Sequence, residues 1–274
     1  MKIQLLRLCI CLISISAWSQ AKHGTIVVLF GLFDDDIALA ADSRAIVGHS
    51  YAPNDCKIAT IDNKLIITSS GMNGRVLTGG HLDYSTFTIA AEVAARFSAR
   101  EVAFNTFGSR FAEAWAVSFG EALQHDMDSH PNEATDSANG VIVGLSDKGV
   151  LGYWFVRWRR VIASDRKTVQ HTVTRKDWPG LVLLGEGAIA DEAINGSTAR
   201  GKKWKLDIQA HADKLPADQR NAFFARQFVD LSIRNLPPGT IEGYKVQDVG
   251  GPIDSITMDR NGRIKWGEHK PECK

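Results

Sequence analysis

Residues 24–45 read GTIVVLFGLFDDDIALAADSRA and contain two apolar runs separated by an acidic turn. The first run (25–30) is rich in β-branched residues, and the second (37–41) has a similarly buried character. Such continuous apolar runs predict strands that are covered on both faces. The turn at residues 31–36 is expected to be solvated, because three adjacent carboxylates in a tight hairpin cannot all face one cation.

A second hairpin follows at residues 57–68, KIATIDNKLIIT, with its turn at Asp62-Asn63. Periodicity and turn residues predict the rest of the chain. The further expected elements are helices at about 84–97, 109–124, 188–194 and 217–235, strands at 140–145, 150–155, 181–184, 255–258 and 264–266, and a polar loop at 125–139. This order favours an α+β fold in which helices cover two stacked sheets.

The first 21 residues have the pattern of a secretion signal. Lys2 and Arg7 precede an apolar run at residues 8–18, and small residues lie near Ala21. The run is shorter than the about 20 apolar residues that span a bilayer; a retained anchor is the alternative. We therefore expect residues 1–21 to be removed and residues 22–274 to form one exported domain, secreted or periplasmic.

Removal of that segment would leave 30 basic and 31 acidic residues, a net charge of −1. A near-neutral chain has no electrostatic reason to bind nucleic acid or an anionic membrane. The basic cluster Arg157, Arg159 and Arg160 is expected to be solvated. Cys56 and Cys273 would remain, and an oxidising compartment favours their pairing. The alternative is a flexible tail in which Cys273 is free.

Three motifs carry a resemblance to a known family. They are Gly24-Thr25 before the first strand, ADSRA at 41–45 after the second, and the hairpin that begins at Lys57 and ends with SSG at 69–71. In this order and spacing they resemble the proteasome β-subunit family and its bacterial relatives. The resemblance is closest over residues 24–75. It implies the four-layer αββα sandwich of the N-terminal-nucleophile hydrolases.

The resemblance also implies a catalytic role for four residues. Thr25 would be the nucleophile, and its freed α-amine would be the base. Lys57 would hold that amine neutral by its charge, and Asp42 would pair with Lys57. Gly71 would donate its backbone N–H to the oxyanion. The substrate pocket implied by the same matching would be small and mildly polar, lined by Ala45, Ala59, Ser69 and Asn73.

These assignments imply a threonine-type peptidase or amidohydrolase that acts on short peptides or small amides. A homo-oligomer, such as a ring, is the implied assembly, and no metal or organic cofactor is implied. The alternative is a non-catalytic scaffold or binding protein that keeps the fold. The hairpins at 25–41 and 57–68 are expected in one sheet, with Thr25, Asp42, Lys57 and Gly71 at one end of it.

The sequence departs from the family pattern in its spacing and its supporting residues. One extra residue separates Thr25 from Asp42, and an alternative alignment puts Gly24 at the nucleophile position. Glu186 replaces a supporting serine. Val246 replaces a supporting aspartate, and an acid occurs only two residues later, at Asp248.

Exposure of the Thr25 amine would need a second cut. A signal peptidase acting after Ala21 would leave residues 22–24 in front of Thr25. In the family the threonine itself cuts the bond that precedes it. Gly24 is suited to the sharp turn that this cut requires.

Overall fold

The computed structural model describes residues 20–23, 25–32, 36–47, 50–52, 56–76, 82–98, 107–130, 137–163, 166–237, 239–241, 244–246, 249–270 and 273. Most of the expected signal segment, Gly24, residues 33–35 of the acidic turn and Asp248 lie outside these residues. The expected cleavage point at Ala21 lies within strand β1 (Gln20–His23).

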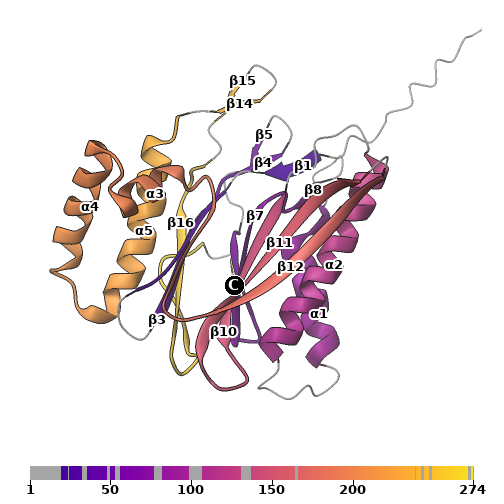
Figure 1. The fold of residues 1–274 in the computed structure, drawn as a ribbon, viewed down its shortest axis with the longest axis horizontal. Helices are drawn as coiled ribbons and strands as arrows, with labels where there is room; N and C mark the ends of the chain where they lie inside the picture. Colours follow the sequence, from indigo (N-terminus) through magenta and orange to yellow (C-terminus); the bar gives the residue numbers. More distant parts are fainter. Residues whose placement is uncertain are drawn as a thin grey trace, which may run out of the picture.

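Two five-stranded antiparallel sheets form the centre of the described fold (Figure 1). Sheet I has the strand order β13-β2-β3-β16-β17, and sheet II has the order β12-β11-β10-β7-β6. The strands of sheet I are β2 (Ile26–Gly31), β3 (Asp36–Asp42), β13 (Gly180–Gly185), β16 (Ile253–Asp259) and β17 (Ile264–Trp266). The strands of sheet II are β6 (Ile58–Ile61), β7 (Leu65–Gly71), β10 (Ala138–Leu145), β11 (Leu151–Ala163) and β12 (Arg166–Asp177).

The two N-terminal hairpins lie in different sheets, so the expectation that they share one sheet was wrong. The β2–β3 hairpin pairs with β13 and β16, whereas the β6–β7 hairpin pairs with β10. Their apolar side chains meet between the sheets instead, where Val27 and Leu39 pack in one cluster with Ile58 and Ile66. Continuous apolar runs are compatible with either arrangement, because each strand is covered on both faces.

Helices cover the outer face of each sheet (Figure 1). The helices α1 (Thr86–Ser98) and α2 (Phe107–Ser129) pack on sheet II around Trp115 and Trp158. Sheet I is covered by α5 (Ala217–Asn235), and α3 (Ala188–Asn195) and α4 (Ala199–Ala212) pack against α5 and against each other. This order of layers is the expected αββα sandwich, and the α+β fold class is confirmed.

A third sheet lies at one end of the sandwich, at the top in Figure 1. Its strand order is β5-β4-β1-β8-β9, so that β1 pairs with a strand on each side. The sequence did not predict these short strands. They are β4 (Ala45–Val47), β5 (Ser50–Ala52), β8 (Gly74–Val76) and β9 (Leu82–Ser85). A separate two-stranded sheet joins β14 (Gly239–Ile241) and β15 (Tyr244–Val246).

Three further expectations fail for local reasons. The polar loop expected at 125–139 is helical to Ser129, because α2 continues while burying Asp126 and Met127. Strand β12 was missed because it is an edge strand of mixed polarity, and α4 was missed because it is polar on most sides.

Within the described residues, no helix is both long and apolar enough to cross a membrane.

Candidate functional site

Thr25 is held at the head of β2 by the turn that follows β13. Its carbonyl oxygen accepts a hydrogen bond from the backbone N–H of Glu186 at 3.0 Å. Gly185 precedes this contact with φ +70°, and a Cβ atom there would lie 1.9 Å from the Thr25 carbonyl oxygen. Only glycine fits so close to this backbone. Thr25 itself is buried, with 1% of its surface exposed.

Asp42, the last residue of β3, receives hydrogen bonds at both carboxylate oxygens. Oδ1 accepts from the Thr25 hydroxyl at 3.2 Å and from the Ile26 backbone N–H at 2.8 Å. Oδ2 accepts from the backbone N–H groups of Gly250 at 2.9 Å and Arg44 at 3.3 Å. These contacts fix the carboxylate beneath the threonine hydroxyl.

The carboxylate of Asp42 is fully buried, and this burial raises its pKa above the ordinary value. The positive charge of Lys57 and the hydrogen bonds from Ile26, Gly250 and Thr25 act in the opposite direction. Burial disfavours the charged form of an acid, whereas a nearby cation favours it. The net effect is a carboxylate that takes up a proton more readily than an exposed aspartate.

Lys57 reaches the same hydroxyl from sheet II. Its side chain is fully buried, and Nζ donates to Thr25 Oγ1 at 2.5 Å. The backbone at this point is held by Thr68, whose hydroxyl donates to the Lys57 carbonyl oxygen at 2.7 Å. The threonine hydroxyl therefore lies between an ammonium that donates to it and a carboxylate that accepts from it. The structure brings together three of the four predicted catalytic residues.

Gly71 lies at the same end of sheet II as Lys57, because Thr68 pairs with Ile58 and β7 ends three residues later. Gly71 has φ +82°, and an added Cβ atom would lie 2.3 Å from the carbonyl oxygen of Ser137. A side chain is therefore excluded by conformation and by space. Its role as an oxyanion donor stays a prediction.

The predicted pocket residues separate into two groups. Ser69 and Asn73 are buried, and both form hydrogen bonds with Thr86, the first residue of α1. The hydroxyl oxygens of Ser69 and Thr86 lie 2.7 Å apart. The Thr86 N–H donates to the Asn73 carbonyl oxygen at 2.8 Å. Among the described residues, Asn73 Oδ1 is buried without a hydrogen-bond partner. Ala59 packs against the core beneath α1 and α2, and Ala45 belongs to β4, with its side chain outside the described part.

The supporting contacts differ from those that the sequence suggested. Glu186 acts on Thr25 through its backbone N–H, and its residue surface is exposed. Val246 lies in β15, and Asp248 is not described. Asp42 Oδ2 instead accepts a hydrogen bond from the backbone N–H of Gly250. Sequence reasoning missed Gly250 and Thr86, although the Gly250-Gly251 pair before β16 signalled a specialised loop.

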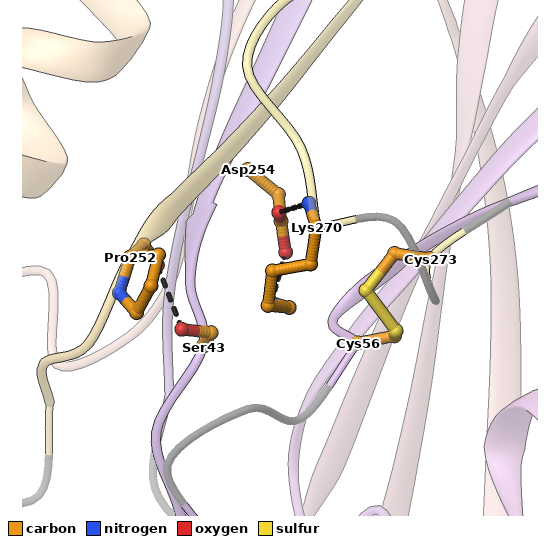
Figure 2. Close-up of a disulfide and its surroundings, with 6 residues drawn as sticks. All are labelled: Ser43, Cys56, Pro252, Asp254, Lys270 and Cys273. Atoms are coloured by element: carbon orange, nitrogen blue, oxygen red, sulfur yellow. Dashed lines mark hydrogen bonds and ion pairs between the residues drawn. A yellow bond between two sulfur atoms is a disulfide. The ribbon is translucent and has the colours of Figure 1, made fainter.

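Cys56, the residue before Lys57, forms a disulfide with Cys273, with the two Cα atoms 5.5 Å apart (Figure 2). The expected pairing is confirmed. The alternative, a tail with Cys273 free, is excluded, and Cys273 is 1% exposed. The C-terminal residue of this bridge therefore lies beside the segment that carries the buried lysine.

No protein-family model matches the chain, and no curated protein matches it. Solved structures do match. The helical assembly of the Anbu complex from Pseudomonas aeruginosa is 14% identical over 90% of this chain and 87% of that chain, with a TM-score of 0.55. Anbu (ancestral beta-subunit) from Yersinia bercovieri is 15% identical over 88% of this chain and 86% of that chain, with a TM-score of 0.49.

The prediction that the chain belongs to the proteasome β-subunit family was wrong. No family model supports it, and the structural neighbour that supports the fold is an Anbu complex at only 14% identity. Similarity at this level shows a shared fold and leaves the chemistry to be argued from this chain's own residues. The chain thus has the proteasome-like fold of the Pseudomonas aeruginosa Anbu structure.

Proposed function

We propose that this chain is a threonine-type N-terminal-nucleophile hydrolase that cleaves amide bonds in short peptides or small amides. The observation that carries the proposal is the position of Thr25 Oγ1, 2.5 Å from Lys57 Nζ and 3.2 Å from Asp42 Oδ1. All three residues are buried. A buried ammonium and carboxylate on one hydroxyl form an electrostatic environment that is typical of an activated nucleophile.

In the proposed reaction the Thr25 hydroxyl oxygen attacks the carbonyl carbon of the substrate. The hydroxyl proton passes to the free α-amine of Thr25 and then to the leaving nitrogen as the C–N bond breaks. Water then hydrolyses the resulting ester, which releases the acid and restores the hydroxyl. The Lys57 ammonium favours the neutral, basic form of the amine, because a nearby positive charge disfavours a second one.

The α-amine must first be released from its peptide bond. In the proposed processing, the Thr25 hydroxyl attacks the carbonyl of Gly24, the C–N bond breaks, and water hydrolyses the ester. Strand β1, which ends at His23, pairs with β4 on one side and β8 on the other. Its departure would leave a slot between two strand edges. An extended peptide can fill such a slot by backbone hydrogen bonding, which supports a peptide substrate.

We further propose that the protein is exported and self-associates. The Cys56–Cys273 disulfide suits an oxidising compartment and supports export. The Anbu complex from Pseudomonas aeruginosa is a helical assembly, which supports self-association here. Light scattering of the purified protein would give its mass; a monomer at all concentrations would contradict self-association.

One observation favours a non-catalytic scaffold as the second candidate. The segment before Thr25 is itself a paired strand of the third sheet, with Lys22 opposite Val47 and Gly74. If this strand stays covalently attached, the nitrogen of Thr25 remains an amide and cannot act as a base. The fold would then serve binding or assembly.

Intact-mass measurement of the purified full-length product separates the two functions. We expect the hydrolase to start at Thr25, and Thr25→Ala to leave the preceding residues attached. Thr172→Ala, at an exposed position of β12, is the matched control and should process normally. Processed protein should also gain the mass of a peptide epoxyketone, which requires an amine and a neighbouring hydroxyl. An unprocessed chain that does not react would establish the scaffold.

A further inference from the structure

The three residues around the threonine hydroxyl come from two sheets. Thr25 precedes β2 and Asp42 is the last residue of β3 in sheet I, whereas Lys57 precedes β6 at the edge of sheet II. The apolar cluster between the sheets includes Ile58, the residue after Lys57. Apolar packing alone is non-directional. The lysine's reach to Thr25 therefore also depends on what fixes the backbone just before β6.

A covalent link fixes that point. Cys56 is bonded to Cys273, which is 217 residues away in the sequence. The C-terminal segment is thereby attached at the residue just before Lys57, and β6 begins at the residue just after it.

The same C-terminal segment is anchored to sheet I (Figure 2). The Lys270 backbone N–H donates to Asp254 Oδ1 at 3.0 Å, and Lys270 Nζ forms an ion pair with Asp254 Oδ2. Both residues are buried, Asp254 with 1% and Lys270 with 7% of its surface exposed. Removing one partner of such a buried pair would leave an uncompensated charge, so separating the two residues is costly. The Cys273 N–H donates to the Lys270 carbonyl oxygen at 3.0 Å and joins the two anchors.

Asp254 lies in β16 next to the strand that ends at the site. It pairs with Ala41 in β3, and its neighbour Ile253 pairs with Asp42. The Ser43 hydroxyl donates to the Pro252 carbonyl oxygen at 2.8 Å and ties the next residues together (Figure 2). Sheet I is therefore connected through Asp254, Lys270 and Cys273 to the residue that precedes Lys57.

We propose that Asp254, Lys270, Cys273 and Cys56 form a C-terminal brace that positions the Lys57 ammonium on the Thr25 hydroxyl. The brace joins the two sheets at the site, and it holds only while the Cys56–Cys273 disulfide is intact. These four are positioning residues that act through Lys57. The catalytic consequence rests on the proposed hydrolase function, whereas the structural consequence, a fixed Lys57, does not.

The test compares the full-length protein with Cys56→Ser/Cys273→Ser and with Arg226→Gln. The last variant breaks the exposed Arg226–Glu268 ion pair, which joins α5 to the same tail, and leaves the brace intact, so it is the matched control. The first readout needs no activity: acetic anhydride labelling of Lys57, with exposed Lys64 as the internal reference. We expect Lys57 to be labelled at least about tenfold faster without the disulfide, because burial protects it only while its position is held.

The second readout is kinetic. A displacement of about 1 Å can lower a rate on the order of 10²-fold. We expect kcat for a peptide amide to fall by at least about tenfold in the double serine variant, with KM changed less than about twofold. The pKa of the acid limb of the pH–rate profile should rise toward the roughly 7.7–8.0 of a free α-amine, because the Lys57 charge would lie farther from the amine. A smaller folded fraction would lower the rate and leave this limb in place.

The outcomes separate the brace from the function. Unchanged Lys57 labelling in the folded double serine variant would overturn the brace, whatever the activity. Faster labelling in a protein whose Thr25 is inert would support the brace and reject the hydrolase. If the double serine variant does not fold, wild-type protein treated with dithiothreitol and checked by circular dichroism replaces it. Equal labelling before and after reduction would then overturn the brace.

Discussion

Lys57 Nζ lies 2.5 Å from Thr25 Oγ1, although the two residues belong to segments on different sheets. Thr25 Oγ1 in turn donates to Asp42 Oδ1 at 3.2 Å. A fully buried lysine is uncommon, because burial removes the hydration of its charge and a nearby partner must offset that cost. Here the charge of Lys57 acts on Asp42, so the hydroxyl bridges a buried pair of opposite charges. Substitutions at this pair and in the backbone around it should therefore have distinct consequences.

Replacing the lysine should separate catalysis from stability. Lys57→Met keeps the length of the side chain and removes the charge, so we expect kcat to fall by about 10²-fold or more. It should also destabilise the fold by roughly 3–5 kcal/mol, since Asp42 would be buried without its cation. Kinetics and urea unfolding measure the two effects.

The double variant Lys57→Met/Asp42→Asn should recover most of that stability and none of the activity. Lys64→Met, in the exposed turn of the same hairpin, should change neither quantity. Full activity in Lys57→Met would remove the lysine from the proposed mechanism.

Asp42 should make stability depend on pH. Its pKa is raised in the folded state by burial, above the ordinary 3.8 that applies to the unfolded chain. The folded state therefore holds the proton more tightly, and the unfolded state loses it first. The contribution of Asp42 to stability is full below pH 3.8 and is lost as the pH rises through the folded pKa.

Urea unfolding of the wild type and Asp42→Asn between about pH 3 and pH 7 measures this effect. We expect the free energy of unfolding of the wild type to fall with rising pH relative to that of Asp42→Asn. The comparison uses the change of the unfolding free energy with pH and not its absolute value, because asparagine also loses the hydrogen bond from the Gly250 N–H. A difference that rises with pH would show a lowered pKa instead.

Gly71 and Gly149 allow strain to be separated from a clash. Both have positive φ, +82° and +70°, but a Cβ atom at Gly71 would lie 2.3 Å from the Ser137 carbonyl oxygen, whereas one at Gly149 meets nothing within 4 Å. We expect Gly149→Ala to cost roughly 1–2 kcal/mol, the left-handed backbone penalty alone. Gly71→Ala should cost clearly more. Equal losses in urea unfolding would show that the Gly71 backbone shifts freely.

Arg75 and Asp126 form a second buried ion pair, which links β8 to α2. Their side chains are 1% and 2% exposed, and Arg75 Nη2 donates to Asp126 Oδ2 at 2.9 Å. We expect Arg75→Met to destabilise the protein by about 3–5 kcal/mol, because the Asp126 charge would remain buried. Arg75→Met/Asp126→Leu should be closer to the wild type. Thermal unfolding measures both variants. A double variant no more stable than Arg75→Met would contradict this prediction.

The fold class and the composition of the candidate site could be predicted from local sequence patterns. The apolar runs at 25–30 and 37–41 are strands β2 and β3, and the Asp62-Asn63 turn closes the β6–β7 hairpin with φ values of +51° and +50°. Local patterns were sufficient there, because burial on both faces and turn conformation are properties of short segments. Thr25, Asp42 and Lys57 were named from the same segments.

The sheet that each hairpin joins could not be predicted in this way, because pairing partners such as β13, β10 and β16 lie far along the chain. The short strands around β1 are defined by their neighbours, because three or four residues are too few to form a recognisable pattern. The edge strand β12 is also defined by its neighbour, because its residues are of mixed polarity. The same holds for Gly250 at Asp42 and Thr86 at Ser69. The distance between Lys57 and Thr25 is set by two sheets and by a disulfide spanning 217 residues, and sequence spacing contains no measure of it.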